Sequence, residues 1–195
     1  MGFKLNTKNI SLCKKCGLCN NQQPLLQKKI VKSSIFWVGL SAVKNTDLFD
    51  NEPLSPRTST GKLISEIEEM LPEFSFYKTN AVKCLPLNND GKIRYPTTKE
   101  MNLCFQNMQM EINKINPSII ILLGAQVSQF FLKQYNIPPI SFNDEFSYSS
   151  VNSSTIKLLP IHHPSYIQVY KRKKSTEYKQ SVSTAIRDMH LYSAL

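Results

Sequence analysis

The chain has 195 residues, which suits one domain with a sizeable core, and 41% of them are hydrophobic. Its apolar runs fall short of the roughly 20 residues of a membrane helix, and the N-terminus lacks a secretory signal. We therefore expect a cytoplasmic protein without membrane contact. Lys and Arg number 24 against 14 Asp and Glu, and the net charge of +10 favours a polyanionic partner, although a generally Lys-rich composition would give the same balance.

Three of the five cysteines fall in CKKCGLC near the N-terminus, as Cys13, Cys16 and Cys19. Two residues between neighbouring thiols let one turn of chain point both sulfurs at a metal, whereas a disulfide across so short a loop would be strained. An odd cysteine count without a signal peptide also argues against disulfides. The spacing predicts a metal centre, and zinc and an iron–sulfur cluster both stay open because each accepts four thiolates.

Cys84 and Cys104 lie far from this group and from each other. A structural zinc finger would normally supply a second close pair, so dispersed ligands suit a cluster that ties distant segments together. The alternative is that both residues are ordinary buried thiols.

Apolar periodicity and turn residues predict alternating strands and helices behind the cysteine segment. In chain order we expect a strand over 35–40, an irregular polar loop over 41–60, a helix over 61–71, a strand over 76–84, a turn-rich segment over 88–96, a helix over 98–115, a strand over 119–123, a helix over 125–134, a surface loop or edge hairpin over 141–155, a short strand from 156 into His162 and a helix over 176–195. This alternation predicts an α/β fold, a three-layer α/β/α arrangement with a central, mainly parallel four-stranded sheet. We expect a single domain over 1–195, with a cysteine-bearing segment over 1–34.

Four short segments carry the residues suited to chemistry: CKKCGL from Cys13, VGLSAVKNTD from Val38, YKTNAVKCLP from Tyr77 and HPS from His163. In this order they resemble motifs of the uracil-DNA glycosylase superfamily, most closely its iron–sulfur-containing branches. The third segment is the most specific, and the resemblance reaches to Tyr166. It implies a monomeric, monofunctional enzyme that flips a nucleotide out of DNA and hydrolyses its N-glycosidic bond.

The same resemblance implies a 4Fe-4S cluster held by Cys13, Cys16, Cys84 and Cys104, with zinc as the alternative metal. Cys19 is then an extra thiol. The interval between Cys84 and Cys104 is somewhat longer than in the family. Cys19 could therefore take the place of one of the four ligands.

Cleavage of the bond puts positive charge on the sugar and negative charge on the departing base, so it requires a group that positions water and a donor to the base oxygen. By resemblance His163 is that donor. Asn80 resembles the residue that reads the flipped base, because its amide offers both a donor and an acceptor; the alternative is an Asn that caps a turn. We expect His162 to be a structural neighbour, and the basic run 171–174 to be a solvated patch or a contact to phosphates.

Two positions depart from the family pattern. Leu40, after Gly39, replaces the Glu of the Gly-Glu-Ala-Pro-Gly motif, which leaves Asp47 and Asn45 as candidates for positioning water. Asp47 could instead cap the following turn. Leu54 stands where the family commonly has a Phe that stacks on the base, a contact worth roughly 1–3 kcal/mol. We assign base binding to Gly39, Leu40, Leu54 and Asn80.

A smaller wall at Leu54 leaves room for a pyrimidine bulkier than uracil. We hypothesise excision of uracil or a modified pyrimidine to leave an abasic site, for example a modified cytosine of phage DNA in antiviral defence. One alternative is a catalytically weak module that binds DNA or a modified base. Another is a structural protein stapled by zinc.

Overall fold

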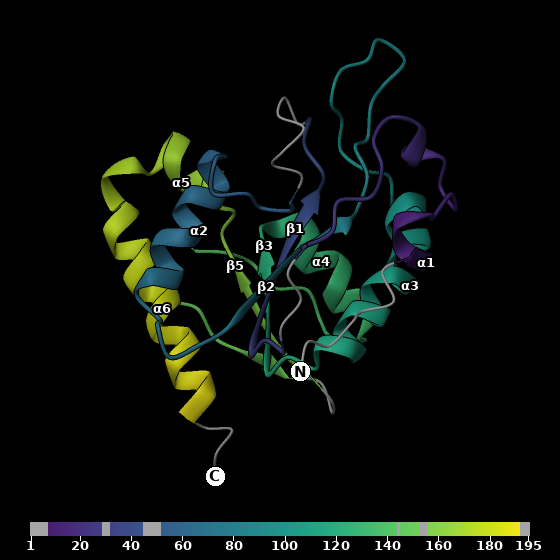
Figure 1. The fold of residues 1–195 in the computed structure, drawn as a ribbon. Coiled ribbons are helices and arrows are strands. Elements are labelled where there is room, and N and C mark those ends of the chain that lie inside the picture. The colour runs from purple at the N-terminus through teal and green to yellow at the C-terminus, as the bar shows by residue number, and fades with distance from the viewer. Residues whose placement is uncertain (1–7, 29–31, 45–51, 144, 153–155, 192–195) are drawn as a thin grey trace.

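A five-stranded sheet runs through the centre of the structure, a computed structural model that describes residues 8–28, 32–44, 52–143, 145–152 and 156–191 (Figure 1). The strand order is β2-β1-β3-β5-β4. The strands are β1 (Ile35–Ser41), β2 (Phe76–Val82), β3 (Ile119–Leu123), β4 (Val151–Asn152) and β5 (Lys157–Ile161). All neighbours pair in parallel except β4, which runs antiparallel to β5.

The predicted α/β fold with a mainly parallel sheet is confirmed, but the predicted number of four strands is wrong by one. The additional strand, β4, pairs with Leu158 and Lys157 at the edge of the sheet. It lies in the segment 141–155, which the sequence predicts as a surface loop or an edge hairpin. Two residues are too few to produce an alternating apolar pattern, so periodicity cannot reveal this strand.

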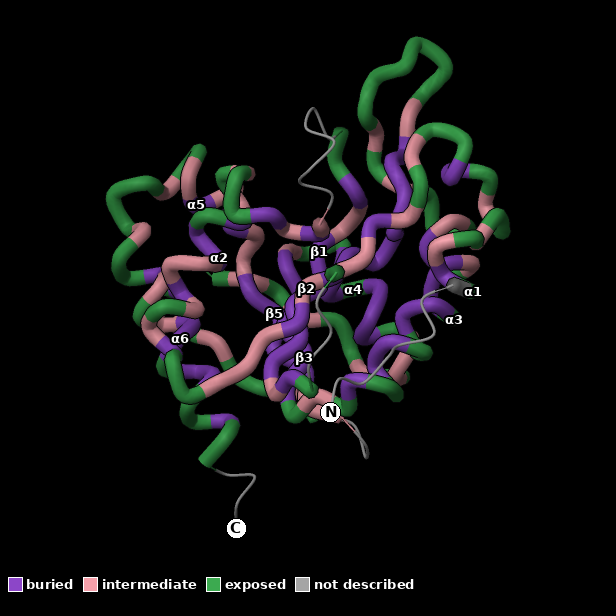
Figure 2. The backbone as a smooth tube through the Cα atoms, viewed as in Figure 1, coloured by how far each residue is buried: buried purple, intermediate pink, exposed green. Residues whose placement is uncertain are grey.

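Helices cover both faces of the sheet. They are α1 (Lys8–Ser11), α2 (Ser59–Glu69), α3 (Thr98–Ile115), α4 (Ala125–Gln134), α5 (Pro164–Tyr170) and α6 (Ser175–Leu191). α3 and α4 share a core with Phe36 and Tyr77, whereas α2 and α6 share a core with Trp37 on the other face. β1, β3 and β5 are therefore largely buried on both sides (Figure 2), which is why they read as apolar runs, whereas the edge strand β4 is half-buried to exposed.

Most predicted boundaries agree with the structure. The helices over 98–115 and 125–134 and the strand over 119–123 begin and end at the predicted residues. α2 begins two residues before the predicted start at Gly61, because the Thr58 hydroxyl caps the helix by accepting a hydrogen bond from the Gly61 backbone N–H (3.0 Å).

The helix α5 is present in the structure but was not predicted. This helix follows β5 directly, with His163 as its capping residue and Pro164 in its first turn. Proline in the first turn of a helix is a known start signal, so the His-Pro-Ser sequence could have indicated the helix. None of the helices in the described ranges is long and apolar enough to cross a membrane.

The carboxyl ends of the parallel strands meet at one edge of the sheet. Gly39 in β1 pairs with Asn80 in β2, and β3 and β5 end beside each other, where Gly124 donates its backbone N–H to the Ile161 carbonyl (2.8 Å). His163 comes two residues after the end of β5. This is the edge at which α/β sheets bind ligands.

Candidate active site

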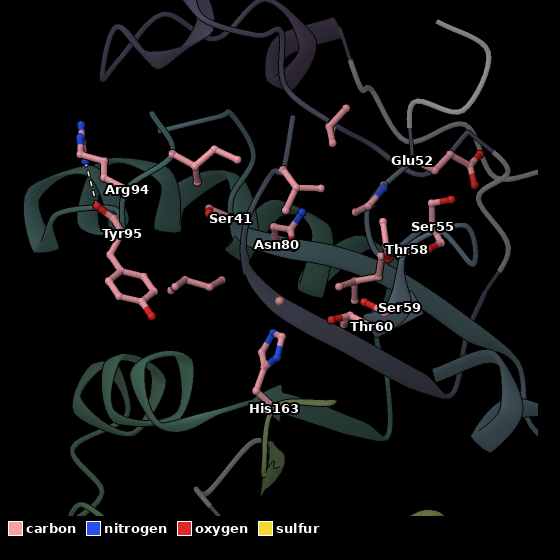
Figure 3. A pocket seen from close by; sticks show the side chains of 17 residues that line it. Ser41, Glu52, Ser55, Thr58, Ser59, Thr60, Asn80, Arg94, Tyr95 and His163 are labelled. Atoms are coloured by element: carbon pink, nitrogen blue, oxygen red, sulfur yellow. Dashed lines mark hydrogen bonds between the residues drawn. The ribbon is translucent and has the colours of Figure 1, made fainter. Parts of the chain in front are cut away.

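A cleft of about 740 Å³ opens at this edge of the sheet (Figure 3). The predicted base-binding residues and the predicted donor all line it: Gly39, Leu40, Leu54, Asn80 and His163. They come from β1, β2, the loop before α2 and the start of α5, so the fold brings together residues that are far apart in the sequence. The other two predicted catalytic residues, Asp47 and Asn45, lie outside the described residues.

The floor of the cleft depends on the absence of a side chain at Gly39. A Cβ atom there would lie 2.4 Å from Oδ1 of Asn80 and 2.9 Å from Cδ2 of Leu54, which is too close for either contact. Asn80 is buried, and its amide faces the cleft. No described side chain hydrogen-bonds to that amide, so its donor and acceptor both remain open to a ligand.

The loop of Pro53, Leu54 and Ser55 forms the opposite wall. Leu54 has a positive φ of 52°, which is uncommon for a residue other than glycine. Gly61 in α2 allows the loop to pass closely, because a Cβ at this position would lie 1.9 Å from the Ser55 carbonyl oxygen. The loop and α2 are therefore held tightly together, with the Leu54 side chain against Gly39.

His163 has a defined ring orientation. Its Nδ1 accepts a hydrogen bond from the Ser165 backbone N–H (3.2 Å) and lies 2.7 Å from the Ser165 hydroxyl. A ring whose Nδ1 accepts carries its proton on Nε2, by inference from this bonding. Burial lowers the pKa of His163, so the ring is neutral at neutral pH and offers Nε2–H as a donor.

This shift predicts a pH dependence of stability. Above pH 6.5, His163 is neutral in both the folded and the unfolded chain. As the pH falls below 6.5, the unfolded chain takes up the proton first. The free energy of unfolding therefore decreases until the pH reaches the lowered pKa of the folded state. We expect denaturant titrations at pH 7.5 and 5.0 to show a larger loss for wild type than for His163→Asn. Equal losses would contradict the lowered pKa.

No carboxylate on the described part of the cleft replaces the Glu that is missing at position 40. Glu52 is on the rim, but its Oε1 accepts a hydrogen bond from the Lys28 backbone N–H (3.1 Å). Figure 3 shows its side chain directed away from Asn80 and His163. The group that positions water is therefore still to be sought at Asp47 and Asn45.

The cleft also contains residues that the sequence analysis assigned to a turn-rich segment. Arg94 donates two hydrogen bonds to the Glu100 carboxylate (2.9 and 2.6 Å), which fixes the end of this segment to the start of α3. Tyr95 next to it is 72% exposed and lines the cleft. An exposed aromatic residue between polar turn residues was the signal that could have marked it.

The four predicted cluster cysteines are also brought together. Cys13, Cys16, Cys84 and Cys104 all line one small cavity beside the end of β2, and each has a free thiol. Cys19 is buried but does not line this cavity. The thiol of Cys19 is nevertheless close enough to raise the pKa of Cys84, ahead of Cys13 in effect, so the choice of Cys13, Cys16, Cys84 and Cys104 as ligands stays a prediction.

The chemistry of this cavity fits a group that takes several thiolates. Burial, together with the smaller effect of the nearby thiols, raises the pKa of the Cys84 thiol to about 12. Ionised sulfurs so close together require a cationic partner. In the described ranges no three His, Cys, Asp or Glu side chains are arranged to hold a single metal ion. The metal centre therefore stays a prediction.

Comparison with known proteins places this architecture in a family. A sequence profile of the Uracil DNA glycosylase superfamily matches residues 20–187. The Type-4 uracil-DNA glycosylase of Archaeoglobus fulgidus is 27% identical over 186 residues, covering 88% of this chain and 85% of that protein. The Type-4 uracil-DNA glycosylase of Thermotoga maritima is 31% identical over 130 residues, covering 63% of this chain and 59% of that protein.

A solved structure, the crystal structure of wild-type Pedobacter heparinus SMUG2, matches with a TM-score of 0.54 at 13% identity, over 82% of this chain and 76% of that one. This likeness concerns the fold. Fold, cleft and relatives together define a monofunctional DNA glycosylase. The chain belongs to the uracil DNA glycosylase superfamily, as its motifs predict.

Proposed function

We propose that this glycosylase hydrolyses the N-glycosidic bond of a flipped uracil or modified pyrimidine in DNA and leaves an abasic site. The observation that carries the proposal is the convergence of Asn80 and His163 on one cleft, where Gly39 lets the side chains of Asn80 and Leu54 approach the backbone of β1 closely. The amide of Asn80 matches the donor and acceptor edge of a pyrimidine. A protein of this superfamily with that cleft is suited to recognise a single extruded base.

In the proposed reaction the neutral His163 donates Nε2–H to the base oxygen on which negative charge grows. The donor is preorganised, because the hydrogen bond from the Ser165 backbone N–H fixes the ring. Water attacks C1′ of the sugar as the bond to the base breaks, and Asp47 or Asn45 is proposed to position it. The electron pair of the broken bond leaves with the base, and the proton that the attacking water loses neutralises the departing base, so no oxidant or reductant is required.

Exposed apolar side chains surround the mouth of the cleft and support DNA as the partner. Ile93 and Tyr95 line the cleft itself. Val169 and Tyr170 line an adjoining pocket, which shares Tyr95 with the cleft. Aromatic rings stack on bases, and the basic residues 171–174 that follow Tyr170 suit phosphates.

Leu54 is the basis for proposing a substrate larger than uracil. Its side chain lies against Gly39 on the floor of the cleft, where a Phe ring would fill more of the space. We propose a modified pyrimidine, such as a modified cytosine of phage DNA, and with it a role in antiviral defence. Mass-spectrometric identification of the bases released from uracil-containing DNA and phage DNAs tests this: release of uracil alone contradicts the modified substrate.

Replacing Leu54 with Phe is expected to narrow the substrate range. The ring restores a stacking surface worth roughly 1–3 kcal/mol on uracil while it closes the space for a bulky substituent. We expect the ratio of kcat/KM for uracil over a 5-substituted cytosine to rise at least about tenfold. Leu54→Met, which conserves volume without adding a ring, is the matched control. An unchanged ratio in Leu54→Phe would remove Leu54 as the determinant.

A second candidate function is a module that binds DNA or a modified base without cleaving it. The replacement of the motif Glu by Leu40 favours this candidate, since the described cleft has no other carboxylate aimed at the reacting atoms. Tight binding of DNA without release of any base would support it.

We also propose that Cys13, Cys16, Cys84 and Cys104 hold a 4Fe-4S cluster, with zinc as the alternative. The proposed reaction has no redox step. When bound, such a cluster would supply cross-links between segments of the chain. The N-terminal segment already contacts the end of β2, where Asn21 Nδ2 donates to the Leu85 carbonyl (3.0 Å). The proposed ligands would tie that segment to β2 and α3.

A further inference from the structure

A buried ion pair joins the end of β2 to α3. The side chains of Lys83 and Glu111 are 1% and 0% exposed, and the ammonium of Lys83 contacts the carboxylate of Glu111 directly. Burying two charges costs more free energy than their attraction commonly returns, so such a pair is weak support for stability alone. The position of the pair in the fold points to a role other than stability.

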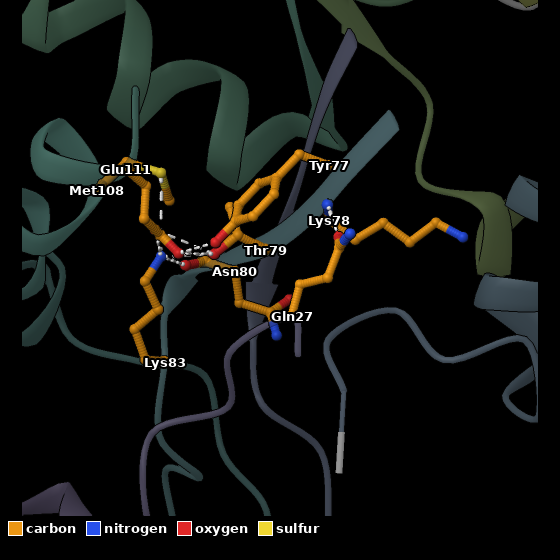
Figure 4. A network of polar contacts seen from close by, with 8 residues as sticks. All are labelled: Gln27, Tyr77, Lys78, Thr79, Asn80, Lys83, Met108 and Glu111. Carbon is orange, nitrogen blue, oxygen red and sulfur yellow. Dashed lines mark hydrogen bonds and ion pairs between the residues drawn. The ribbon is translucent and has the colours of Figure 1, made fainter. Parts of the chain in front are cut away.

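The pair is part of a continuous polar network (Figure 4). Lys83 Nζ donates to the Thr79 hydroxyl oxygen (2.6 Å) and to the backbone carbonyl of Asn80 (2.8 Å). Glu111 accepts hydrogen bonds from the Tyr77 hydroxyl (2.8 Å) and from the Thr79 hydroxyl (3.2 Å). Every charged or hydroxyl group in the network therefore has a partner, and one of those partners is the backbone of the residue proposed to read the base.

The other side of the network reaches the cysteine cavity. Lys83 lines that cavity together with its neighbour Cys84, and its backbone carbonyl accepts a hydrogen bond from the Leu25 N–H (2.8 Å). Glu111 lies seven residues after Cys104, which places both on the same face of α3. The ion pair thus lies between the proposed cluster ligands and the base-binding cleft.

We infer that the Lys83–Glu111 pair positions Asn80, so that the selectivity of the cleft for a base depends on this buried network. The inference rests on the proposed function, in which Asn80 reads the base. Lys83 does not line the cleft and acts only as a positioning residue. By holding the Asn80 carbonyl, its ammonium fixes the peptide that follows Asn80, and with it the direction in which the Asn80 amide points.

A pair of variants separates this role from a merely structural one. Lys83→Met leaves the Glu111 carboxylate buried without its cation, so we expect Tm to fall by roughly 10 °C. Adding Glu111→Gln removes the unpaired charge and should recover most of that loss. The matched control is the double variant Lys78→Met, Glu68→Gln. Lys78 also lies on β2, and its ammonium is 2.8 Å from the Glu68 carboxylate, so this variant removes a different ion pair from the same strand.

The decisive readout is base selectivity in binding, which does not depend on turnover. Oligonucleotides carrying 2′-fluoro-2′-deoxyuridine or 2′-fluoro-2′-deoxycytidine resist cleavage, because the fluorine disfavours positive charge on the sugar. The two bases have the same shape and differ at the edge that Asn80 would read. In the Lys83→Met, Glu111→Gln variant we expect the ratio of the two Kd values to move toward one by about tenfold. This is the change expected when one well-oriented hydrogen-bonded contact to a base is lost.

The control variant should keep the wild-type ratio. A Lys83→Met, Glu111→Gln protein with recovered Tm and an unchanged ratio overturns the inference. If that variant fails to fold, Thr79→Val decides, because it removes the hydroxyl that anchors the ammonium. A ratio closer to one than in wild type supports the inference, and an unchanged ratio overturns it. A wild type that neither discriminates the two bases nor releases one contradicts the proposed function, and this inference falls with it.

Discussion

Replacing His163 with alanine is expected to lower kcat by about 10²- to 10³-fold, equivalent to about 3–4 kcal/mol of barrier. The variant loses the proposed Nε2–H donor at the atom where negative charge develops. The fold should survive, because the structural cost is mainly the cap of α5, which is worth about 1 kcal/mol. Single-turnover release of base together with Tm measures both effects.

His162 provides the matched control for this experiment. It is the adjacent residue, but its Nδ1 contacts the Tyr148 hydroxyl (2.8 Å) and its ring stacks on Tyr166, away from the base-binding cleft. His162→Ala should keep kcat within a few-fold of wild type while lowering Tm through lost packing. If both histidine variants lose activity to the same extent, His163 has no special role as donor.

Replacing Cys84 with alanine is expected to reduce soluble yield and bound metal far more than it changes chemistry in the cleft. A metal site that exists only in the folded chain contributes its binding free energy to folding. Removing one of four ligands should therefore lower Tm strongly, whereas Cys19→Ala, outside the cavity, should keep both metal and yield. Equal Tm values for wild type and Cys84→Ala would contradict the ligand assignment.

The identity of the metal follows from the same preparations. A 4Fe-4S cluster gives a brown protein with absorbance in the visible range and iron in each chain. Colourless protein with stoichiometric zinc would reject the cluster and would favour the zinc alternative. In either case the loss of metal in Cys84→Ala, compared with Cys19→Ala, tests the same set of ligands.

The layers of the fold could be predicted from the sequence because its strongest signals are local. The apolar run at 119–123 and the helical period at 98–115 predicted elements that the structure reproduces residue for residue. β4 and α5 were missed for different reasons: β4 is too short to have a period, and the start signal of α5 at Pro164 also belongs to the His-Pro-Ser motif directly after β5.

The candidate site was predictable where motif residues line the cleft, as Gly39, Asn80 and His163 do. The network behind it was not. Lys83 and Glu111 are 28 residues apart and meet only because α3 packs on β2, so no spacing rule connects them. Tyr95 was missed because a single aromatic residue is a weak signal in a segment whose other residues mainly indicate turns. Tertiary packing, which a single sequence does not display, decides such contacts.

The most direct test of the central claim is abasic-site formation in uracil-containing DNA by wild type and by the Asn80→Ala, His163→Ala double variant. We predict that wild type produces abasic sites and that the double variant, folded as judged by Tm, produces them at least about 10³-fold more slowly, because it lacks both the base-reading amide and the donor. Equal rates for the two proteins, or intact DNA with both on uracil and on modified pyrimidines, would contradict an active site built from Asn80 and His163.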